Sequence, residues 1–494
     1  MEDALTQLEQ GSTALDSAYD DALKRIDSQL EGLRNLARKV LLWITYAKRE
    51  LSIEELQEAI AVRPGRQNLD LRKYINDPDQ IVSVCHGLVE VDQESRAIRL
   101  VHYTAQEYFE RVRSQWLPDG DLTISQSCIA YLSMSMFACD RCEWHMDLST
   151  TIKQHAFLEY AGKTWGVHAR TVQSKELRTS IIHFLSNAGY LRFTAMITLG
   201  TFSHASYGRR YECHRSEVSA VHVSAYFGLY DTMQDLIQAA ENINCKDNFS
   251  ETPLHVAAEE GHVDIVRLLL AQPSIEINTK NQYSGTPLST AIEEGHAEIV
   301  QLLLAQPSIE INAKNEYSGT PLSIAAERGH TEVVRLLLAQ SGIDVHIKND
   351  YNNTTLFIAS KKGHAGIVQL LLAQSGIDIN IKNEFGGTSL FIAAKGGHIK
   401  IVQLLLAQSG INVNPQNVFG NTPLAIATGK GHIEIVRLLL AQSGIEVNTK
   451  DMNYYTPLSV ATKEGHTEIV QLLLAHPGIE APQELIDGSI STKD

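Results

Sequence analysis

The amino-acid sequence predicts a mostly α-helical protein in which a solenoid of repeated helix pairs follows a domain with a short β-hairpin. A Gly-His pair recurs every 34 residues between Gly261 and Gly465. Each copy also carries two short apolar segments with helical spacing. Ahead of the repeats, two strand-like runs lie between helical segments. At 494 residues, the chain is long enough for two or three folded units.

The residues around each Gly-His pair explain why every copy should form two helices. The glycines of the seven pairs are Gly261, Gly295, Gly329, Gly363, Gly397, Gly431 and Gly465. A threonine precedes the first helix as its N-cap, and in five copies a proline follows, as in Thr252-Pro253. The glycine ends this helix, and a second amphipathic helix follows, as in residues 263–270. A degenerate copy at residues 221–228 is expected to cap the array.

These residues resemble the ankyrin repeat, whose signature is Thr-Pro-Leu-His-x-Ala followed by Gly-His. The first full copy has the signature histidine, His255. The other copies replace it with Ser289, Ser323, Phe357, Phe391, Ala425 and Ser459. The resemblance implies about seven full repeats within residues 219–480. It also implies an array that binds protein partners along its concave face and hairpin tips.

An aromatic residue recurs at the tip of each predicted hairpin. These candidate partner-binding residues are Phe249, Tyr283, Tyr317, Tyr351, Phe385 and Phe419. In the seventh copy the aromatics shift to Tyr454 and Tyr455. The ankyrin resemblance implies that this position faces solvent, and exposed rings can bury a large area on binding at a small entropic cost. The alternative is that each ring packs on the neighbouring hairpin.

The two residues ahead of each Gly-His pair change charge along the array. The early copies carry Glu259, Glu260, Glu293 and Glu294, whereas later copies carry Lys361, Lys362 and Lys395. The concave face is therefore predicted to be acidic at its N-terminal end and basic toward its C-terminal end, which makes these residues partner-binding candidates. The alternative is sequence drift on a solvated surface.

Residues 14–118 are predicted to form a winged-helix-like domain after an N-terminal tail at residues 1–13. The pattern indicates a helix over 14–48, a helix after the capping box at Ser52, and a hairpin of runs 87–92 and 97–102. The segment before the hairpin is acidic and lacks an arginine placed to read bases. The net charge of −16 repels phosphate backbones as well, so no nucleic-acid partner is expected.

Three stretches of this domain, 40–56, 81–89 and 100–109, resemble the winged helix that follows the NACHT ATPase in fungal STAND-type (NLR-like) receptors. In that family the histidine of the last stretch, His102 here, faces the bound nucleotide. The resemblance implies the ligand-recognition part of a NACHT–ankyrin signalling receptor. An alternative is a regulator in trans of a full-length NACHT ATPase. His102 would then be a packed relic of a nucleotide sensor, or would act beside an ATPase on another polypeptide.

Residues 119–218 are predicted to bridge the two parts through helices at 124–137, 155–168 and 176–193. Gly162-Lys163-Thr164 is a fragment of a P-loop, but Phe157 stands where the first glycine is needed. The sequence contains no nucleophile elbow or HExxH motif, so no enzymatic activity and no cofactor are expected. An uncharacterised enzyme within residues 121–218 is the weaker alternative.

The cysteines and the chain ends complete the prediction. Cys139, Cys142 and His145 have metal-ligand spacing, but no second pair follows, so no metal is expected and the cysteines should be reduced thiols. No apolar run approaches a membrane span, and an intracellular protein is expected, in the cytoplasm or alternatively the nucleus. Residues 467–475 nearly repeat an interior copy, and a tail at 481–494 follows. This uncapped end is predicted to fray or to self-associate weakly.

Overall fold

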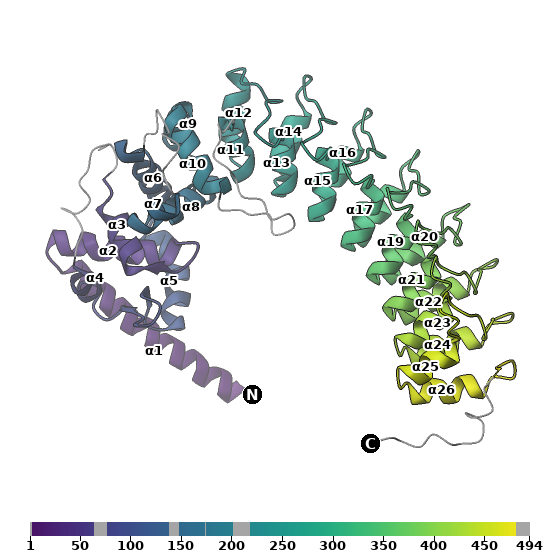
Figure 1. Ribbon diagram of the computed structural model, residues 1–494. Coiled ribbons are helices and arrows are strands. Elements are labelled where there is room, and N and C mark those ends of the chain that lie inside the picture. Colours follow the sequence, from purple (N-terminus) through teal and green to yellow (C-terminus); the bar gives the residue numbers. More distant parts are fainter. Residues whose placement is uncertain (1, 64–76, 138–147, 173, 201–217, 481–494) are drawn as a thin grey trace. The chain divides into compact units, whose positions relative to one another are not determined.

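The computed structural model describes residues 2–63, 77–137, 148–172, 174–200 and 218–480 (Figure 1). Within these ranges the chain forms two compact units, which divide between Ile275 and Glu276. The first unit contains the winged helix, the bridging helices and the first two helix pairs of the repeat array. The second unit contains the other six helix pairs.

The N-terminal part of the first unit is a winged helix, as the sequence predicts. Its elements are α1 (Glu2–Asp27), α2 (Glu31–Tyr46), β1 (Leu51–Ser52), α3 (Ile53–Ala61), α4 (Pro78–Ser83), β2 (Val89–Val91), β3 (Ala97–Leu100) and α5 (Tyr103–Trp116). The strands form an antiparallel sheet in the order β1-β3-β2, in which Val89 pairs with Leu100. The predicted capping box is present, because Ser52 and Glu55 each accept a hydrogen bond from the other's backbone amide.

The bridging helices and the first two helix pairs complete the first unit. They are α6 (Gly120–Leu132), the 3-10 turn η2 (Ser135–Phe137), α7 (Leu148–Gln154), α8 (Leu158–Arg170), α9 (Lys175–Ser186), α10 (Ala188–Gly200), α11 (Ala220–Phe227), α12 (Tyr230–Gln238), α13 (Pro253–Glu259) and α14 (Val263–Leu270).

Two helices that the sequence predicts as continuous are each divided in the structure. The predicted helix 14–48 breaks after Asp27, because the Gln29 side chain turns away to donate to the Val84 carbonyl at 2.8 Å. Moreover, α1 begins at Glu2, within the residues assigned to a tail. The predicted helix 176–193 divides at Asn187, whose side-chain oxygen accepts from the next helix's first amides. Both breaks depend on side-chain hydrogen bonds rather than on proline.

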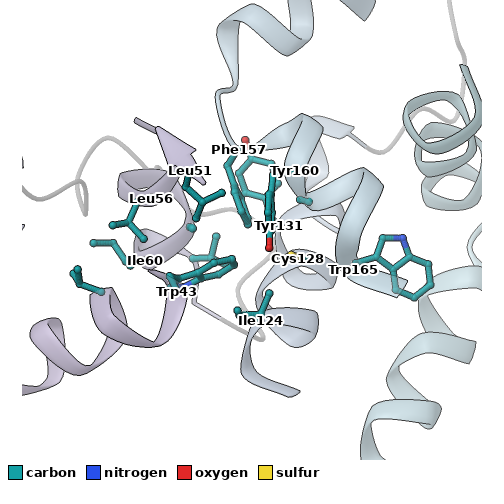
Figure 2. Packing of buried hydrophobic residues seen from close by; sticks show 14 of the residues in the cluster. Trp43, Leu51, Leu56, Ile60, Ile124, Cys128, Tyr131, Phe157, Tyr160 and Trp165 are labelled. Atoms are coloured by element: carbon teal, nitrogen blue, oxygen red, sulfur yellow. The ribbon is translucent and has the colours of Figure 1, made fainter. Parts of the chain in front are cut away.

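One hydrophobic core joins the three parts of the first unit. The Trp43 ring of α2 meets Phe157 edge-on, with ring centroids 5.3 Å apart, and Phe157 in turn contacts Tyr131 of α6 (Figure 2). Farther along α8, Trp165 packs on Phe227 of α11 with centroids 4.9 Å apart. The bridging helices therefore pack against the winged helix on one side and against the first repeat helices on the other, within one core.

The second unit is a regular stack of helix pairs (Figure 1). Its first helices are α15 (Pro287–Glu294), α17 (Pro321–Arg328), α19 (Thr355–Lys362), α21 (Ser389–Gly396), α23 (Pro423–Gly429) and α25 (Pro457–Lys463). Its second helices are α16 (Ala297–Leu304), α18 (Thr331–Leu338), α20 (Ala365–Leu372), α22 (Ile399–Leu406), α24 (Ile433–Leu440) and α26 (Thr467–Leu474). Each first helix packs on the next first helix, as the repeat pattern predicts.

The geometry of the stack explains why the Gly-His pair recurs. The His330 imidazole lies over the turn of the preceding repeat, where its Nε2 donates to the Glu293 carbonyl at 3.1 Å. A Cβ atom on Gly295 would lie 2.7 Å from the His330 ring. The same Gly295 has a φ of +78°, which favours glycine. The glycine of one copy therefore makes room for the histidine of the next.

An asparagine ladder also links neighbouring copies of the second unit, and one step of it is missing. Asn312 donates to the Gly342 carbonyl at 2.8 Å and accepts from the Asp344 amide at 3.0 Å. Both bonds recur at Asn278, Asn380, Asn414 and Asn448. The copy between those of Asn312 and Asn380 has His346 at this position. Within the described ranges no hydrogen bond joins its side chain to the next loop.

Replacing His346 with asparagine is expected to restore this step and to stabilise the array by about 1 kcal/mol, because two loop groups gain a partner. Urea unfolding followed by far-UV circular dichroism measures the change. Asn380→His is the matched control, since it removes an existing step and should shift the transition in the opposite direction. Equal or lower stability of His346→Asn would contradict this explanation of the ladder.

The C-terminal end of the array is more open than its interior. Val470 is partly exposed, whereas the matching Val436 one repeat earlier is fully buried. The Ile469 and Leu473 side chains remain buried beneath the end. Some apolar surface is therefore left uncovered by residues up to 480, and fraying or self-association of this end stays a prediction.

Candidate partner-binding surface

The hairpin tips of the second unit are built by a polar turn that presents the aromatic side chain. In the tip that carries Tyr317, the Asn315 side-chain oxygen accepts from the amides of Tyr317 and Gly319 at 3.1 and 2.8 Å. Ser318 between them has a positive φ of 56°. Asparagine suits this turn because its short side chain bonds to the backbone two residues on. The turn places the Tyr317 side chain at the surface, where it is more than half exposed.

At the constant tip position of the second unit, four aromatics are more than half exposed. Tyr317, Tyr351, Phe385 and Phe419 have exposed fractions of 56%, 56%, 53% and 51%. We call these four residues the tip ladder. The Tyr283 side chain of the same unit and the Phe249 side chain of the first unit are partly buried. Most of the ring area of the tip ladder is therefore open to a partner.

Backbone hydrogen bonds hold neighbouring tips together. The Val418 amide donates to the Phe385 carbonyl at 3.0 Å, and the Met452 amide donates to the Phe419 carbonyl at the same distance. Equivalent bonds join Glu316 to Tyr283 and Glu384 to Tyr351. The aromatic side chains consequently project from a bonded row of loops rather than from independent ones.

The charged candidates lie at the C-terminal ends of the first helices. In the second unit, Arg328 lies 4.0 Å from Glu293, and Lys362 lies 3.2 Å from Glu327 on the preceding helix. Such exposed ion pairs contribute little to stability. Lys361 and Lys395 are exposed and take part in no ion pair within the described ranges. The basic character predicted for the later copies thus rests on these two lysines and not on Lys362.

The acidic candidates are divided between the two units. Glu259 and Glu260 end helix α13 of the first unit, where Glu260 is exposed and Glu259 partly buried. Glu294 ends helix α15 of the second unit and is exposed.

Two further exposed residues of the last two tips, Val418 and Met452, were not singled out by sequence reasoning. The shift of the aromatics in the seventh copy pointed only to Tyr454 and Tyr455. Tyr454 is the most exposed large apolar side chain in the described part of the chain, at 81%.

His102 lies on the surface of the winged helix, where it caps helix α5. Its Nδ1 accepts from the Thr104 amide at 3.3 Å and lies 2.9 Å from the Thr104 hydroxyl. That hydroxyl is also 2.6 Å from the Tyr19 phenol. The imidazole is exposed together with the neighbouring side chains of Val101 and Tyr103. His102 is therefore not packed in the core.

The P-loop fragment is an ordinary stretch of helix. Residues 162–164 lie in the middle of α8, so their amides are used within the helix. A Cβ atom on Gly162 would lie 2.3 Å from the Ile197 side chain, which shows that this glycine serves close helix packing. Lys163 forms an ion pair with Glu159 at 2.6 Å. This geometry offers no loop of free amides for a phosphate.

A buried polar network lies in the region that the enzyme alternative concerns. The His168 Nδ1 is 2.6 Å from the Asp121 carboxylate, and its Nε2 is 2.9 Å from the Tyr160 hydroxyl. That hydroxyl also accepts from the Lys48 amide at 3.1 Å. Burial lowers the pKa of His168 below its ordinary value, which favours the neutral ring. Tyr160 and His168 are fully buried, so a substrate has no access to them.

The cysteines and metal ligands of the described residues form no centre. Cys85 and Cys128 are buried and free, and burial raises the pKa of the Cys85 thiol to about 12. No group of three or more histidine, cysteine or carboxylate side chains gathers in the described ranges. Cys139, Cys142 and His145 lie outside the described residues.

A cleft of about 780 Å³ lies beside helices α9, α12 and α14 of the first unit. At one side Arg170 donates to the His262 Nδ1 at 3.3 Å. At another side Arg178 lies 3.9 Å from both Asp231 and Asp235. These polar contacts join the bridging helices to the first repeat helices, and no sequence pattern predicts them.

Comparison with known proteins identifies the array. A family model described as ankyrin repeats matches residues 221–315, 310–383 and 390–484, which together are more than half of the chain. The chain belongs to the ankyrin-repeat family. A second ankyrin-repeat model matches residues 367–406 of the ankyrin array. A model of the winged helix domain of GPI inositol-deacylase matches residues 25–115. The predicted ankyrin array and winged helix are thus confirmed.

Individual relatives cover small parts of the chain. Rabankyrin-5 from Mus musculus is 37% identical over 62 residues, which is 13% of this chain and 5% of that protein. Rabankyrin-5 from Homo sapiens is 36% identical over 61 residues, or 12% of this chain and again 5% of that protein. The chain thus spans about a twentieth of the length of these curated relatives.

One solved ankyrin structure is also similar to part of the chain. The ankyrin repeat domain of Bcl-3, described as a unique member of the IkappaB protein family, aligns at 31% identity with a TM-score of 0.40. The alignment covers 46% of this chain and 99% of that domain.

Among the helices that the structure describes, none is long and apolar enough to cross a membrane.

Proposed function

We propose that this chain is a protein-interaction module that recognises its partner through the tip ladder of the ankyrin array. Ankyrin repeats themselves support a protein–protein interaction scaffold. The observation that carries the finer proposal is the exposure of four rings, each more than half open, at one constant position of successive tips. Aromatic side chains are enriched among residues that dominate binding energy, because they bury much area at low entropic cost.

Within this proposal the winged helix links the array to a NACHT-type ATPase, as part of a signalling receptor or as a regulator in trans. The three stretches that resemble fungal NACHT receptors support this role. The exposed side chains of Val101, His102 and Tyr103 support it too, because they form an open surface beside helix α5. The chain itself is proposed to have no enzymatic activity, which is supported by the full burial of Tyr160 and His168 in the His–Asp–Tyr network described above.

The tip ladder is tested by replacing Tyr317, Tyr351 and Phe385 together with serine. Partners are first captured from cell extract with the full chain, and the affinity of one purified partner is then measured. The triple variant is expected to bind this partner at least about tenfold more weakly, because three exposed rings lose their contact area. Its urea unfolding should stay nearly unchanged, because exposed side chains contribute little to stability.

Ile399→Ser is the matched control, since Ile399 is an exposed apolar residue on the second helix α22 and lies outside the tips. It should bind the partner as tightly as the natural chain does. If the triple variant unfolds much more easily but still captures the partner, the rings are structural and the tip ladder is not the binding surface.

A further inference from the structure

The last two tips of the ankyrin array carry a denser apolar surface than the others. We call Val418, Phe419, Met452, Tyr454 and Tyr455 the C-terminal tip patch. Val418, Phe419, Met452 and Tyr454 are each more than half exposed, and Tyr455 is 41% exposed. The Met452 amide donates to the Phe419 carbonyl, so the two tips lie side by side. Exposed apolar side chains gathered in this way mark interaction sites more often than scattered ones do.

Tyr454 occupies a backbone position that disfavours it. Its φ is +64°, in the left-handed region, where a bulky side chain is uncommon. The other tips place small or turn-forming residues here, namely Ser250, Ser284, Ser318, Asn352, Gly386 and Gly420. The Tyr454 side chain is 81% exposed, so packing does not offset the strain. A strained, exposed aromatic of this kind is explained better by binding than by stability.

One lysine borders the patch on the side of the first helices. The Lys463 ammonium lies 5.0 Å from the centre of the Tyr455 ring, which joins the apolar patch to a positive charge. This local positive charge contrasts with the net charge of −16 for the whole chain. It therefore favours acidic partners locally, although the protein as a whole repels them.

We infer that the C-terminal tip patch binds an acidic peptide segment that also carries aromatic or aliphatic side chains. The apolar side chains of this segment would pack on Phe419, Met452 and Tyr454, while its carboxylates would meet Lys463. The inference rests on the proposed function, because it names the partner chemistry of the same row of tips. The patch shares Phe419 with the tip ladder and extends the row of tips by Val418 and the exposed side chains of the last tip.

The test uses the purified full chain and a library of random twelve-residue peptides displayed on phage. Selected peptides are expected to be rich in aspartate and glutamate together with aromatic or aliphatic residues. A synthetic copy of a selected peptide should bind Tyr454→Asn about tenfold more weakly than the natural chain. Charge reversal in Lys463→Glu should weaken binding about threefold or more and should reduce the dependence of binding on salt.

Stability provides a second readout that separates binding from structure. Asparagine tolerates the left-handed region, so Tyr454→Asn should slow hydrogen exchange in helices α25 and α26 while it weakens peptide binding. A residue with a purely structural role would not improve protection when it is removed. Asn352→Gly is the matched control, because it changes the same turn position without removing a ring, and it should leave peptide binding unchanged.

The outcomes distinguish this inference from the proposed function. Peptides that bind Tyr454→Asn normally but fail on the Tyr317, Tyr351 and Phe385 triple variant would overturn the inference and leave the tip ladder standing. Peptides that depend on neither set would overturn both. Selection of basic peptides, failure to select any peptide, competition by a synthetic 481–494 peptide, or dimerisation through the patch in light scattering would each also overturn the acidic-peptide assignment.

Discussion

Replacement of Glu58 with alanine is expected to lower the free energy of unfolding of the first unit by about 3 kcal/mol. Glu58 projects from α3 and accepts the Tyr131 phenol at 2.6 Å and the Ala156 and Phe157 amides at 3.2 Å each. The two amides lie at the start of α8, where a negative charge is favourable. Alanine would leave buried donors of the core without an acceptor, which costs more than the bonds themselves contribute.

Urea unfolding followed by tryptophan fluorescence measures this loss. Trp43, Trp116 and Trp165 belong to the first unit, and the sequence of residues 276–494 contains no tryptophan, so the signal does not report the second unit. Glu58→Gln is the control, because its amide oxygen can still accept one of the three bonds, and it should lose about half as much stability. Equal stability of the alanine variant and the natural chain would show that Glu58 does not hold α3 to the bridging helices.

Trp165→Ala is expected to cost about 4 kcal/mol, since removal of a fully buried indole leaves a cavity in the core. Trp165 meets Phe184 of α9 edge-on at 5.7 Å and Phe227 of α11 at 4.9 Å between ring centroids. The loss should appear as lower protection of helices α8 and α11 in hydrogen exchange, together with earlier urea unfolding.

The Trp165→Phe variant distinguishes the contribution of side-chain volume from the cost of the buried indole N–H. The indole N–H is buried and has no hydrogen-bond partner among the described residues, so phenylalanine removes an unsatisfied donor as well as some volume. This variant is expected to lose at most about 2 kcal/mol. A loss equal to that of alanine would mean that the indole contributes through a specific contact rather than through the volume it fills.

The repeat array could be predicted from sequence because each of its signals is local. The threonine caps, the proline after them, the glycine and the following histidine recur in one phase, and each acts within its own copy or on the next one. The winged helix was predicted for the same reason, since a capping box and a short hairpin are local features. The resemblance to ankyrin repeats added the expectation that the tip aromatics face solvent.

Other features depend on residues that are distant in sequence, and these could not be predicted. The break between α1 and α2 depends on the hydrogen bond from Gln29 to Val84, 55 residues away. The contact of Glu58 with the start of α8 spans about 98 residues. The sequence predicted the helices that contain Gln29, Glu58 and Phe157, but it carried no sign of these contacts.

The candidate binding site also combines features that the sequence predicts with features that only the tertiary structure shows. The sequence by itself determined which residues stand at the tips, because a fixed 34-residue phase assigns each one a place in the turn. Only the tertiary structure decided which of them are open: Tyr283 is partly buried, whereas Tyr454 is strained and 81% exposed. The physical reason is that backbone turns follow from local side chains, whereas exposure depends on what the neighbouring repeats and the rest of the core cover.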